Sequence, residues 1–438
     1  MKEVFSGGRN PVLPCDICIP DGEAHVFDDR LYVYGSFDIK SSEYCSEEYH
    51  VTSTSDMLTW EVADKSLDGK DIPWSNDKKK KKYYITDMGL RNPTPFYRKM
   101  LKDMHVPIGL MPKFLRPNYI DFSKFVPNSN ILYAPDCACK DGKYYLYFCM
   151  SDYSEGVAVS DNPNGPFTNP VRLPCGGIDP AIFIDDDGAA YYYWGQFRAN
   201  AVKLNADMIT YDEDKVIKNI VTEEEHGFHE GSSIRKRNGI YYYVYPCIYR
   251  ENKPTCLVYA TSSSPLGPFT YRGVIIDNAK CDPESWNIHG SIQDFNGQWY
   301  VFYHRSSKNS RSNRRLCVEK IEFNQDGTIN EVKMTSQGAG LPFAPGELIE
   351  GWRACEVDGG AYVDGTDLIM CNDSSAYIRY VQLNEKSCIE IDAEGKGDIL
   401  VYADDVLLEE SLKGIHEIKL VCRGKLRIKN ITFIDIKE

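Results

Sequence analysis

The sequence predicts an all-β protein, with a five-bladed β-propeller followed by a small C-terminal β-sandwich. Aromatic residues make up 12% of the 438 residues, including 30 tyrosines, and aromatic side chains favour strands. One pattern recurs five times: a polar residue, a short apolar strand, a tight turn and an aromatic strand. After Pro345 the pattern stops, and about 90 residues of short alternating strands follow.

The five repeats predict the five blades in order. The first, "PDGEAHVFDDRLYVYGSFD", starts at Pro20, and the others start at Ala134, Ile178, His229 and Ile288. Their Asp-Asp, Asp-Gly and Asn-Gly turns between alternating strands are strong hairpin signals. The last four start about 45–60 residues apart, which suits a four-stranded blade. Because a single blade leaves both faces uncovered, we expect the blades to close into a ring with a shared core.

The domain plan follows from these repeats. We expect the propeller over 1–340, with an insertion at about 76–130, and the sandwich over 346–438. The insertion contains five consecutive lysines, which indicate a solvated loop, and an apolar stretch. We expect it to form a lid or wall of the pocket; a contact between two copies of the chain is the alternative.

Composition and charge exclude several classes of function. The formal net charge is −14, which argues against nucleic acid and anionic membranes as partners and is compatible with a neutral sugar. No run of 18 apolar residues predicts a membrane helix. The opening "MKEVFSGGRNPVLP" does not resemble a signal peptide, so we expect a cytoplasmic protein whose 15 cysteines are reduced. Nucleophile-elbow, P-loop, dinucleotide and zincin motifs are all missing from the sequence.

Polar residues stand at the head of each repeat. They are Asp21, Asp136, Asp179, Glu230 and His289. The innermost strand of a blade faces the central channel, so these side chains should point into one axial cleft. A carboxylate before a strand is often only a turn or capping residue. Several such carboxylates on one ring repel one another, which favours a functional site.

The order of motifs resembles glycoside hydrolase family 43, whose members are five-bladed propeller enzymes that act on plant-wall pentose and galactose polymers. The matching segments include "NPVLP", "DIPW", "YAPD", "IDPAIFIDDDG", "HEGSSIRKRNGIYYYVY" and "HGSIQDFNGQWYVFYH". The last part of the chain, "LKGIHEIKLVCRGKLRIKNITFI", resembles the end of a family 6 carbohydrate-binding module. That domain has no Trp after Trp352, so we favour a structural or docking role for it over sugar binding.

The resemblance implies roles for three acidic residues. Asp21 matches the general base, Asp179 the residue that tunes and orients the acid, and Glu230 the general acid. The family usually has Asp-Pro at the base, whereas this chain has Asp21-Gly22. Asp16 is therefore the alternative base.

Other residues take supporting roles by the same resemblance. His289 matches a histidine that lies near an axial water or calcium ion, so a structural Ca²⁺ in the channel is expected to contact it through water. Arg314 or Arg315 matches an arginine that touches the sugar. Trp74 is expected to stack on a sugar ring or to pack in the core. Asp136, as the head of the second blade, is assigned to the substrate. His25 and His304 are interpreted as structural.

The chemistry explains why two carboxyl groups are needed. One protonates the leaving oxygen while the other activates water, and an inverting enzyme leaves room for that water between them. The acid must hold its proton near neutral pH, whereas the base must stay ionised.

We therefore predict a cofactor-independent, exo-acting, inverting glycosidase that releases terminal α-L-arabinofuranosyl or β-D-xylosyl units from oligosaccharides, with homo-oligomerisation left open. The alternatives are a non-catalytic sugar-binding propeller, a related enzyme acting on galactosides, or a phosphorylase.

Overall fold

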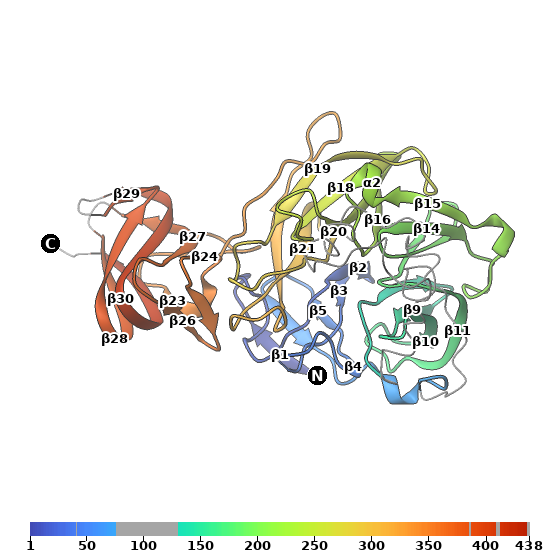
Figure 1. Cartoon of the computed structure of the whole chain (residues 1–438), viewed down its shortest axis with the longest axis horizontal. Coiled ribbons are helices and arrows are strands. Elements are labelled where there is room, and N and C mark those ends of the chain that lie inside the picture. Colours follow the sequence, from blue (N-terminus) through green and yellow to red (C-terminus); the bar gives the residue numbers. More distant parts are fainter. Residues whose placement is uncertain (41, 76–129, 385–386, 409–411, 436–438) are drawn as a thin grey trace, which may run out of the picture.

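The protein is described by a computed structural model in which nearly all regular structure is β. It describes residues 1–40, 42–75, 130–384, 387–408 and 412–435. Figure 1 shows a ring of blue to yellow sheets beside a separate red C-terminal sheet. This confirms the predicted fold class. The expected insertion at about 76–130 lies almost entirely outside the described residues. No described helix is long and apolar enough to span a bilayer.

Each blade is an antiparallel sheet whose strands run outward from the centre of the ring in chain order. The N-terminal strand adds a fifth strand to the outer edge of the first blade. The first blade contains β2 (Glu23–Phe27), β3 (Arg30–Tyr34), β5 (Thr52–Thr54), β6 (Thr59–Val62) and β1 (Lys2–Phe5). The second contains β8 (Asp136–Lys140), β9 (Lys143–Cys149), β10 (Ser154–Ser160) and β11 (Thr168–Gly176).

The remaining blades repeat the arrangement. The third contains β12 (Ala181–Ile184), β13 (Ala190–Trp194), β14 (Arg198–Lys203) and β15 (Ile217–Thr222). The fourth contains β16 (Ser233–Arg237), β17 (Ile240–Cys247), β18 (Cys256–Ser262) and β19 (Thr270–Asp277). The fifth contains β20 (Ser291–Phe295), β21 (Gln298–Arg305) and β22 (Arg315–Ile321). Short elements on the connections are β4 (Glu48–Tyr49), β7 (Leu67–Asp68), η1 (Gly69–Asp71), η6 (Glu213–Lys215) and α2 (Glu223–His226).

The predicted tight turns have the expected backbone. Asp28 and Asp29 have φ of 47° and 61°, and Asn238 and Gly239 have φ of 51° and 77°. Two successive positive φ values match the right-handed twist of the strands that the turn joins. The turns therefore fix the pairing of β2 with β3 and of β16 with β17.

The tyrosine-rich strands fill the spaces between blades. Successive strand residues point to opposite faces of a sheet. Tyr242 accordingly packs in the apolar cluster between the fourth and fifth blades, while Tyr243 packs in the cluster between the third and fourth. Tyr147 and Phe148 divide in the same way between neighbouring clusters. This alternation explains why the strands are apolar on both faces.

The ring closes between the last blade and the first. The inner strands β2, β8, β12, β16 and β20 contact one another in a cycle that ends with β20 against β2. The N-terminal segment also runs beside β22: the N–H of Val12 donates to the carbonyl of Leu316 at 3.0 Å, and Asn10 Nδ2 donates to the carbonyl of Val318 at 2.9 Å. Both closures place Asp21 next to residues from the end of the propeller sequence.

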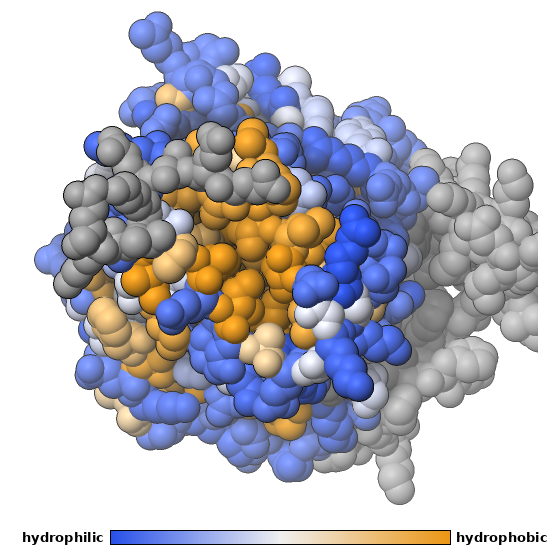
Figure 2. Space-filling model, turned by 90° about the vertical axis from the view of Figure 1, so that its left-hand side faces the viewer, coloured by the Kyte–Doolittle hydropathy of each residue, from blue (hydrophilic) through white to orange (hydrophobic). Residues whose placement is uncertain are grey.

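The C-terminal domain is one strongly bent, nearly closed sheet. Its long strands β28 (Ser387–Ala403) and β30 (Gly414–Asp435) pair along most of their length. The other strands are β23 (Leu348–Glu350), β24 (Glu356–Asp358), β25 (Tyr362–Asp364), β26 (Asp367–Met370), β27 (Ser375–Leu383) and β29 (Val406–Leu407), with η7 (Gly351–Arg353) at the start. Figure 2 shows apolar side chains gathered on the end of the molecule that this domain forms. Val406 and Ile415 are among its exposed apolar residues.

Candidate active site

The ring places four of the five predicted polar residues just before an inner strand. Asp21 precedes β2, Asp179 precedes β12, Glu230 precedes β16 and His289 precedes β20. Asp136 instead is the first residue of β8 itself. Electrostatic interactions link Asp179 with Glu230 and Asp21, and link His289 with Asp21 and Glu230. These four side chains therefore share one site, at one end of the channel.

Asp21 is held as a buried carboxylate. Its oxygens accept hydrogen bonds from Arg314 Nη1 at 2.8 Å and from the hydroxyl of Ser36. Its own N–H donates to Nδ1 of His304 at 3.3 Å. Burial alone would raise the pKa of Asp21, but Arg314 and His304 outweigh it and hold the pKa well below its usual value. Asp21 is thus ionised at any physiological pH, as a general base must be.

The Asp-Gly sequence at this position has a packing reason. Asp21 itself has a φ of 63°, a left-handed conformation that Asp tolerates better than most residues. A Cβ on Gly22 would lie 2.8 Å from Leu316 and 3.3 Å from Phe302. Gly22 therefore lets the loop lie directly on the fifth blade. Asp16, the alternative base, is exposed.

Arg314 is fixed by a second carboxylate. Its Nε and Nη2 each donate to Asp38 at 2.9 Å, and its backbone N–H donates to Asp38 at 3.0 Å. Such bidentate pairing fixes the plane of the guanidinium. Asp38 and Ser36 were not singled out from the sequence, although both lie in the quoted first repeat. His304, interpreted as structural, contacts the base directly.

Asp179 is a buried carboxyl group that lies beside His289 and Glu230. Its N–H donates to Cys149 Sγ at 3.2 Å, and its Oδ2 lies 3.7 Å from Nδ1 of His289. Burial, together with the negative charges of Glu230 and Asp21, raises its pKa well above the usual value. Asp179 is therefore protonated more readily than an ordinary aspartate, because it lies beside Glu230.

Glu230 is the most accessible of the three acidic side chains. Its side chain is 13% exposed, compared with 8% for Asp179 and 4% for Asp21. Gln196 Nε2 donates to its Oε2 at 3.0 Å and fixes its orientation. A group that protonates a leaving oxygen must reach the substrate, and Glu230 is placed to do so.

His289 lies between the acidic residues and is 5% exposed. Burial lowers its pKa, so it is neutral. Its Nε2 has no hydrogen-bond partner among the described residues, and a Cβ on Gly231 would lie 2.8 Å from it. Calcium takes six to eight oxygen ligands. The carboxylates near His289 are those of Asp21, Asp179 and Glu230, which are fewer groups than calcium takes, so water would have to supply the other ligands. The expected contact through water stays a prediction.

Two residues predicted to contact the sugar lie away from these four side chains. Trp74 packs on Phe148 and donates from Nε1 to Ser154 at 3.0 Å, so it is anchored in the second blade. Arg315 is buried beside Trp352 of the C-terminal domain. These positions remain untested as sugar contacts.

Asp136 belongs to a polar cluster on the inner strands. Its Oδ1 lies 2.6 Å from His25 Nε2, and its Oδ2 accepts the N–H of Ile182 at 2.7 Å. Glu23 Oε1 in the same cluster accepts from Arg235 Nη2 at 2.7 Å. Burial raises the pKa of both Glu23 and Asp136 to about 7. Alternate residues of β2 and β16 supply this axial polar cluster, a signal that strand periodicity in the sequence already contained.

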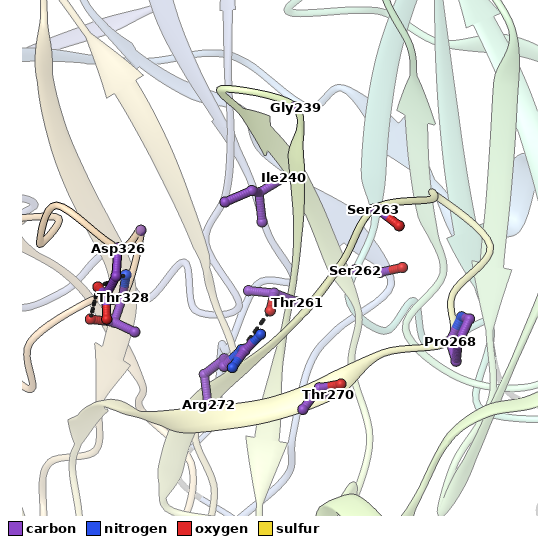
Figure 3. Close-up of a pocket in the computed structure, with 11 residues that line it drawn as sticks. Gly239, Ile240, Thr261, Ser262, Ser263, Pro268, Thr270, Arg272, Asp326 and Thr328 are labelled. Carbon is purple, nitrogen blue, oxygen red and sulfur yellow. Dashed lines mark hydrogen bonds between the residues drawn. The ribbon is translucent and has the colours of Figure 1, made fainter.

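A surface pocket lies away from Asp21, Asp179, Glu230 and His289. It has a volume of about 480 Å³. Figure 3 shows its lining residues on the fourth blade. Its lining includes Thr261, Arg272 and the single carboxylate Asp326, which accepts hydrogen bonds from Thr328. Acid–base hydrolysis needs two carboxyl groups, so this pocket lacks the groups for it.

Comparison with known proteins agrees with the geometry. Residues 116–329 match the model of glycosyl hydrolases family 43, a match that includes Asp179 and Glu230 but not Asp21. A xylosidase/arabinosidase from Thermoclostridium stercorarium is 31% identical over 383 residues, which cover 77% of this chain and 69% of that protein. Xylosidase/arabinosidase 43A from Humicola insolens is 31% identical, covering 72% of this chain and 97% of the relative.

A solved structure extends the likeness to three dimensions. The β-xylosidase/α-arabinofuranosidase from a compost microbial metagenome, crystallised with xylotriose, has a TM-score of 0.56 and 28% identity. The aligned region covers 76% of this chain and 99% of that structure. With the motifs in order, the blades closed into a ring and the acidic residues gathered at its centre, this chain belongs to glycosyl hydrolase family 43.

Proposed function

We propose that the protein is an exo-acting, inverting glycosidase that releases terminal α-L-arabinofuranosyl or β-D-xylosyl units from plant cell-wall-derived oligosaccharides. The observation that carries the proposal is that Asp21, paired with Arg314 at 2.8 Å, shares one site with Asp179 and Glu230. Arg314 keeps Asp21 ionised, while Asp179 has a raised pKa beside Glu230. The names of the relatives, xylosidase and arabinosidase, supply the sugars.

Each acidic residue has a distinct role in this mechanism. Asp21 accepts a proton from the attacking water, because Arg314, Ser36 and His304 hold it as an oriented carboxylate. Glu230, which Gln196 orients, donates its proton to the leaving oxygen as the glycosidic bond breaks. Asp179, whose pKa is raised by burial and by the charges of Glu230 and Asp21, lies beside the acid and would orient it.

The location is part of the proposal. We propose that the enzyme acts inside the cell on short imported oligosaccharides. Support comes from 15 cysteines with no disulfide among the described ones, which is the usual state of thiols in a reducing compartment. Homo-oligomerisation of the chain stays open.

The test is hydrolysis of nitrophenyl glycosides. The panel contains α-L-arabinofuranoside, β-D-xyloside, β-D-galactoside and α-L-arabinopyranoside. We expect activity on one or both of the first two. In Glu230→Gln we expect hydrolysis of xylotriose, whose leaving group needs a proton, to fall by about 10²–10⁴-fold. Glu225→Gln makes the same change on an exposed residue of α2 and should retain activity. The anomer formed first, followed by proton NMR, should be inverted.

Three results would contradict parts of the proposal. Activity confined to the β-D-galactoside would favour the galactoside alternative. Phosphate dependence would indicate a phosphorylase. Binding of xylotriose without hydrolysis by folded wild-type protein would indicate a sugar-binding propeller.

A further inference from the structure

Two arginines face each other at the buried ends of the last two propeller strands. Arg305 ends β21, Arg315 begins β22, and the two are direct partners in the strand register. They are 1% and 3% exposed. Like charges directly opposite each other on neighbouring strands are destabilising. Guanidinium groups stay protonated in proteins, so this pair brings two positive charges together inside the molecule.

Neither guanidinium is neutralised by the described part of the chain. Arg305 Nη1 and Nη2 and Arg315 Nε and Nη1 are buried without a hydrogen-bond partner there. The hydroxyl of Ser306, the next residue after Arg305, is likewise buried without a partner. Neither arginine forms an ion pair with any described carboxylate. The neighbouring Arg314, in contrast, is paired with both Asp21 and Asp38.

The acidic residues near this arginine pair are already committed to other donors. Asp282 interacts electrostatically with Arg315, but its oxygens accept the backbone N–H groups of Glu284 at 2.9 Å and Asn309 at 3.0 Å. Glu319 interacts with Arg305, but it accepts from Thr335, Tyr303 and Asn10 instead. Neither carboxylate therefore bonds to the unpartnered nitrogens of Arg305 and Arg315.

Thiols and an aromatic ring provide the rest of the surroundings. Cys18 and Cys281 interact with Arg315, and burial raises the pKa of their thiols to about 11 and about 12, so neither supplies a negative charge. Arg305 Nε donates to Cys317 Sγ at 3.0 Å. The guanidinium of Arg315 lies 5.7 Å from the ring centre of Trp352, in the C-terminal domain. The arginine pair thus lies where the propeller meets that domain.

We propose that a small monovalent inorganic anion, of the chloride class, binds between Arg305 and Arg315. It would accept hydrogen bonds from both guanidinium groups and from Ser306, and so offset their repulsion. The site is separate from the acid and base and does not depend on the proposed glycosidase activity. Its role is to stabilise the junction between the fifth blade and the C-terminal domain through Arg315 and Trp352.

The direct test is diffraction from wild-type crystals grown in sodium bromide. Bromide replaces chloride and scatters anomalously. We expect an anomalous peak within hydrogen-bonding distance of Arg305 and Arg315. Ordered water at that position, with no anomalous signal and with bromide visible elsewhere, would overturn the proposal. This measurement needs no substitution, so it does not depend on a variant that folds.

A second test measures stability in solution. The thermal unfolding midpoint is recorded as sodium chloride replaces sodium gluconate at constant ionic strength. A ligand that binds only the folded state raises this midpoint in a saturable way. We expect this rise for the wild type and for Arg311→Met, a substitution of an exposed arginine. Arg315→Met, which removes one charge of the pair, should lose the dependence. An equal response in all three proteins would show only a general salt effect and would overturn the proposal.

Discussion

Arg314 donates to the carboxylate of Asp21 at 2.8 Å, and so joins the last blade to the residue that heads the first. The two residues are 293 positions apart, and closure of the ring brings them together. The same guanidinium holds Asp38 by two further hydrogen bonds. A single arginine therefore couples closure of the propeller to the ionisation of the proposed base.

Replacing Arg314 by Lys should move the acidic limb of the pH profile of kcat/KM to higher pH, by about one unit. Lysine keeps the charge but cannot pair with Asp21 and Asp38 in the same planar geometry. The pKa of Asp21, now held low by Arg314, should rise towards its usual range. The kcat/KM at the pH optimum should fall by about 10–100-fold as the base is less well oriented.

Arg311→Lys provides the matched control, because Arg311 is exposed and lies in the same loop as Arg314, between β21 and β22. Circular dichroism should show that both variants fold. An acidic limb that stays in place in folded Arg314→Lys would mean that Asp21 does not limit the reaction at low pH, and the base would have to be sought elsewhere.

Replacing Asp179 by Asn should stabilise the protein at neutral pH while it lowers activity. Burial and the charges of Glu230 and Asp21 raise the pKa of Asp179 in the folded state above its value in the unfolded chain. Below the unfolded value, near pH 4, the group is protonated in both states and carries no penalty. As pH rises from there through the folded pKa, the unfolded state gives up the proton more readily, so wild-type stability falls.

Asn cannot ionise, so the variant should escape this loss. Each unit of pKa rise corresponds to about 1.4 kcal/mol, and we expect a gain of roughly 2 kcal/mol or more at pH 7 that shrinks towards pH 4. Urea unfolding at the two pH values measures it, with the exposed Asp214→Asn as the control. Equal stability of wild type and Asp179→Asn at pH 7 would contradict the raised pKa. Loss of activity without that gain would leave only a role in orientation.

The sequence predicts the blades well because their signals are local. Each hairpin has its own turn residues and its own aromatic strand, so five could be counted without coordinates. For the same reason the sequence predicts the polar residue that precedes the inner strand in four of the blades. Asp136 was grouped with them although it is the first residue of β8 rather than a residue before it. That small change in position moves its side chain from the acidic site to the axial polar cluster with His25.

Other features depend on contacts between distant segments. Arg314 and Arg315 could not be separated by the family resemblance, although adjacent residues at a strand start face opposite sides. In the structure Arg314 donates to Asp21, whereas Arg315 lies over the ring of Trp352. The part played by His304 depends on ring closure, since it contacts a residue 283 positions earlier. No local pattern in the sequence carries that information.

Replacing Arg235 by Met should destabilise the propeller by an amount that grows as the pH rises above 7, because buried Glu23, whose pKa is about 7 beside Arg235, would lose the cation that allows it to ionise. Arg235 Nη2 donates to Glu23 at 2.7 Å, and Arg235 Nε donates to Gln293 at 2.8 Å, so the side chain links three inner strands. Urea unfolding at pH 7 and at pH 9 measures the loss. The double variant Arg235→Met with Glu23→Gln removes the stranded charge and should recover part of the stability, whereas Arg237→Met, at the outer end of β16, should cost little. A double variant no more stable than Arg235→Met would show that lost packing and the lost bond to Gln293, rather than an uncompensated charge, account for the effect.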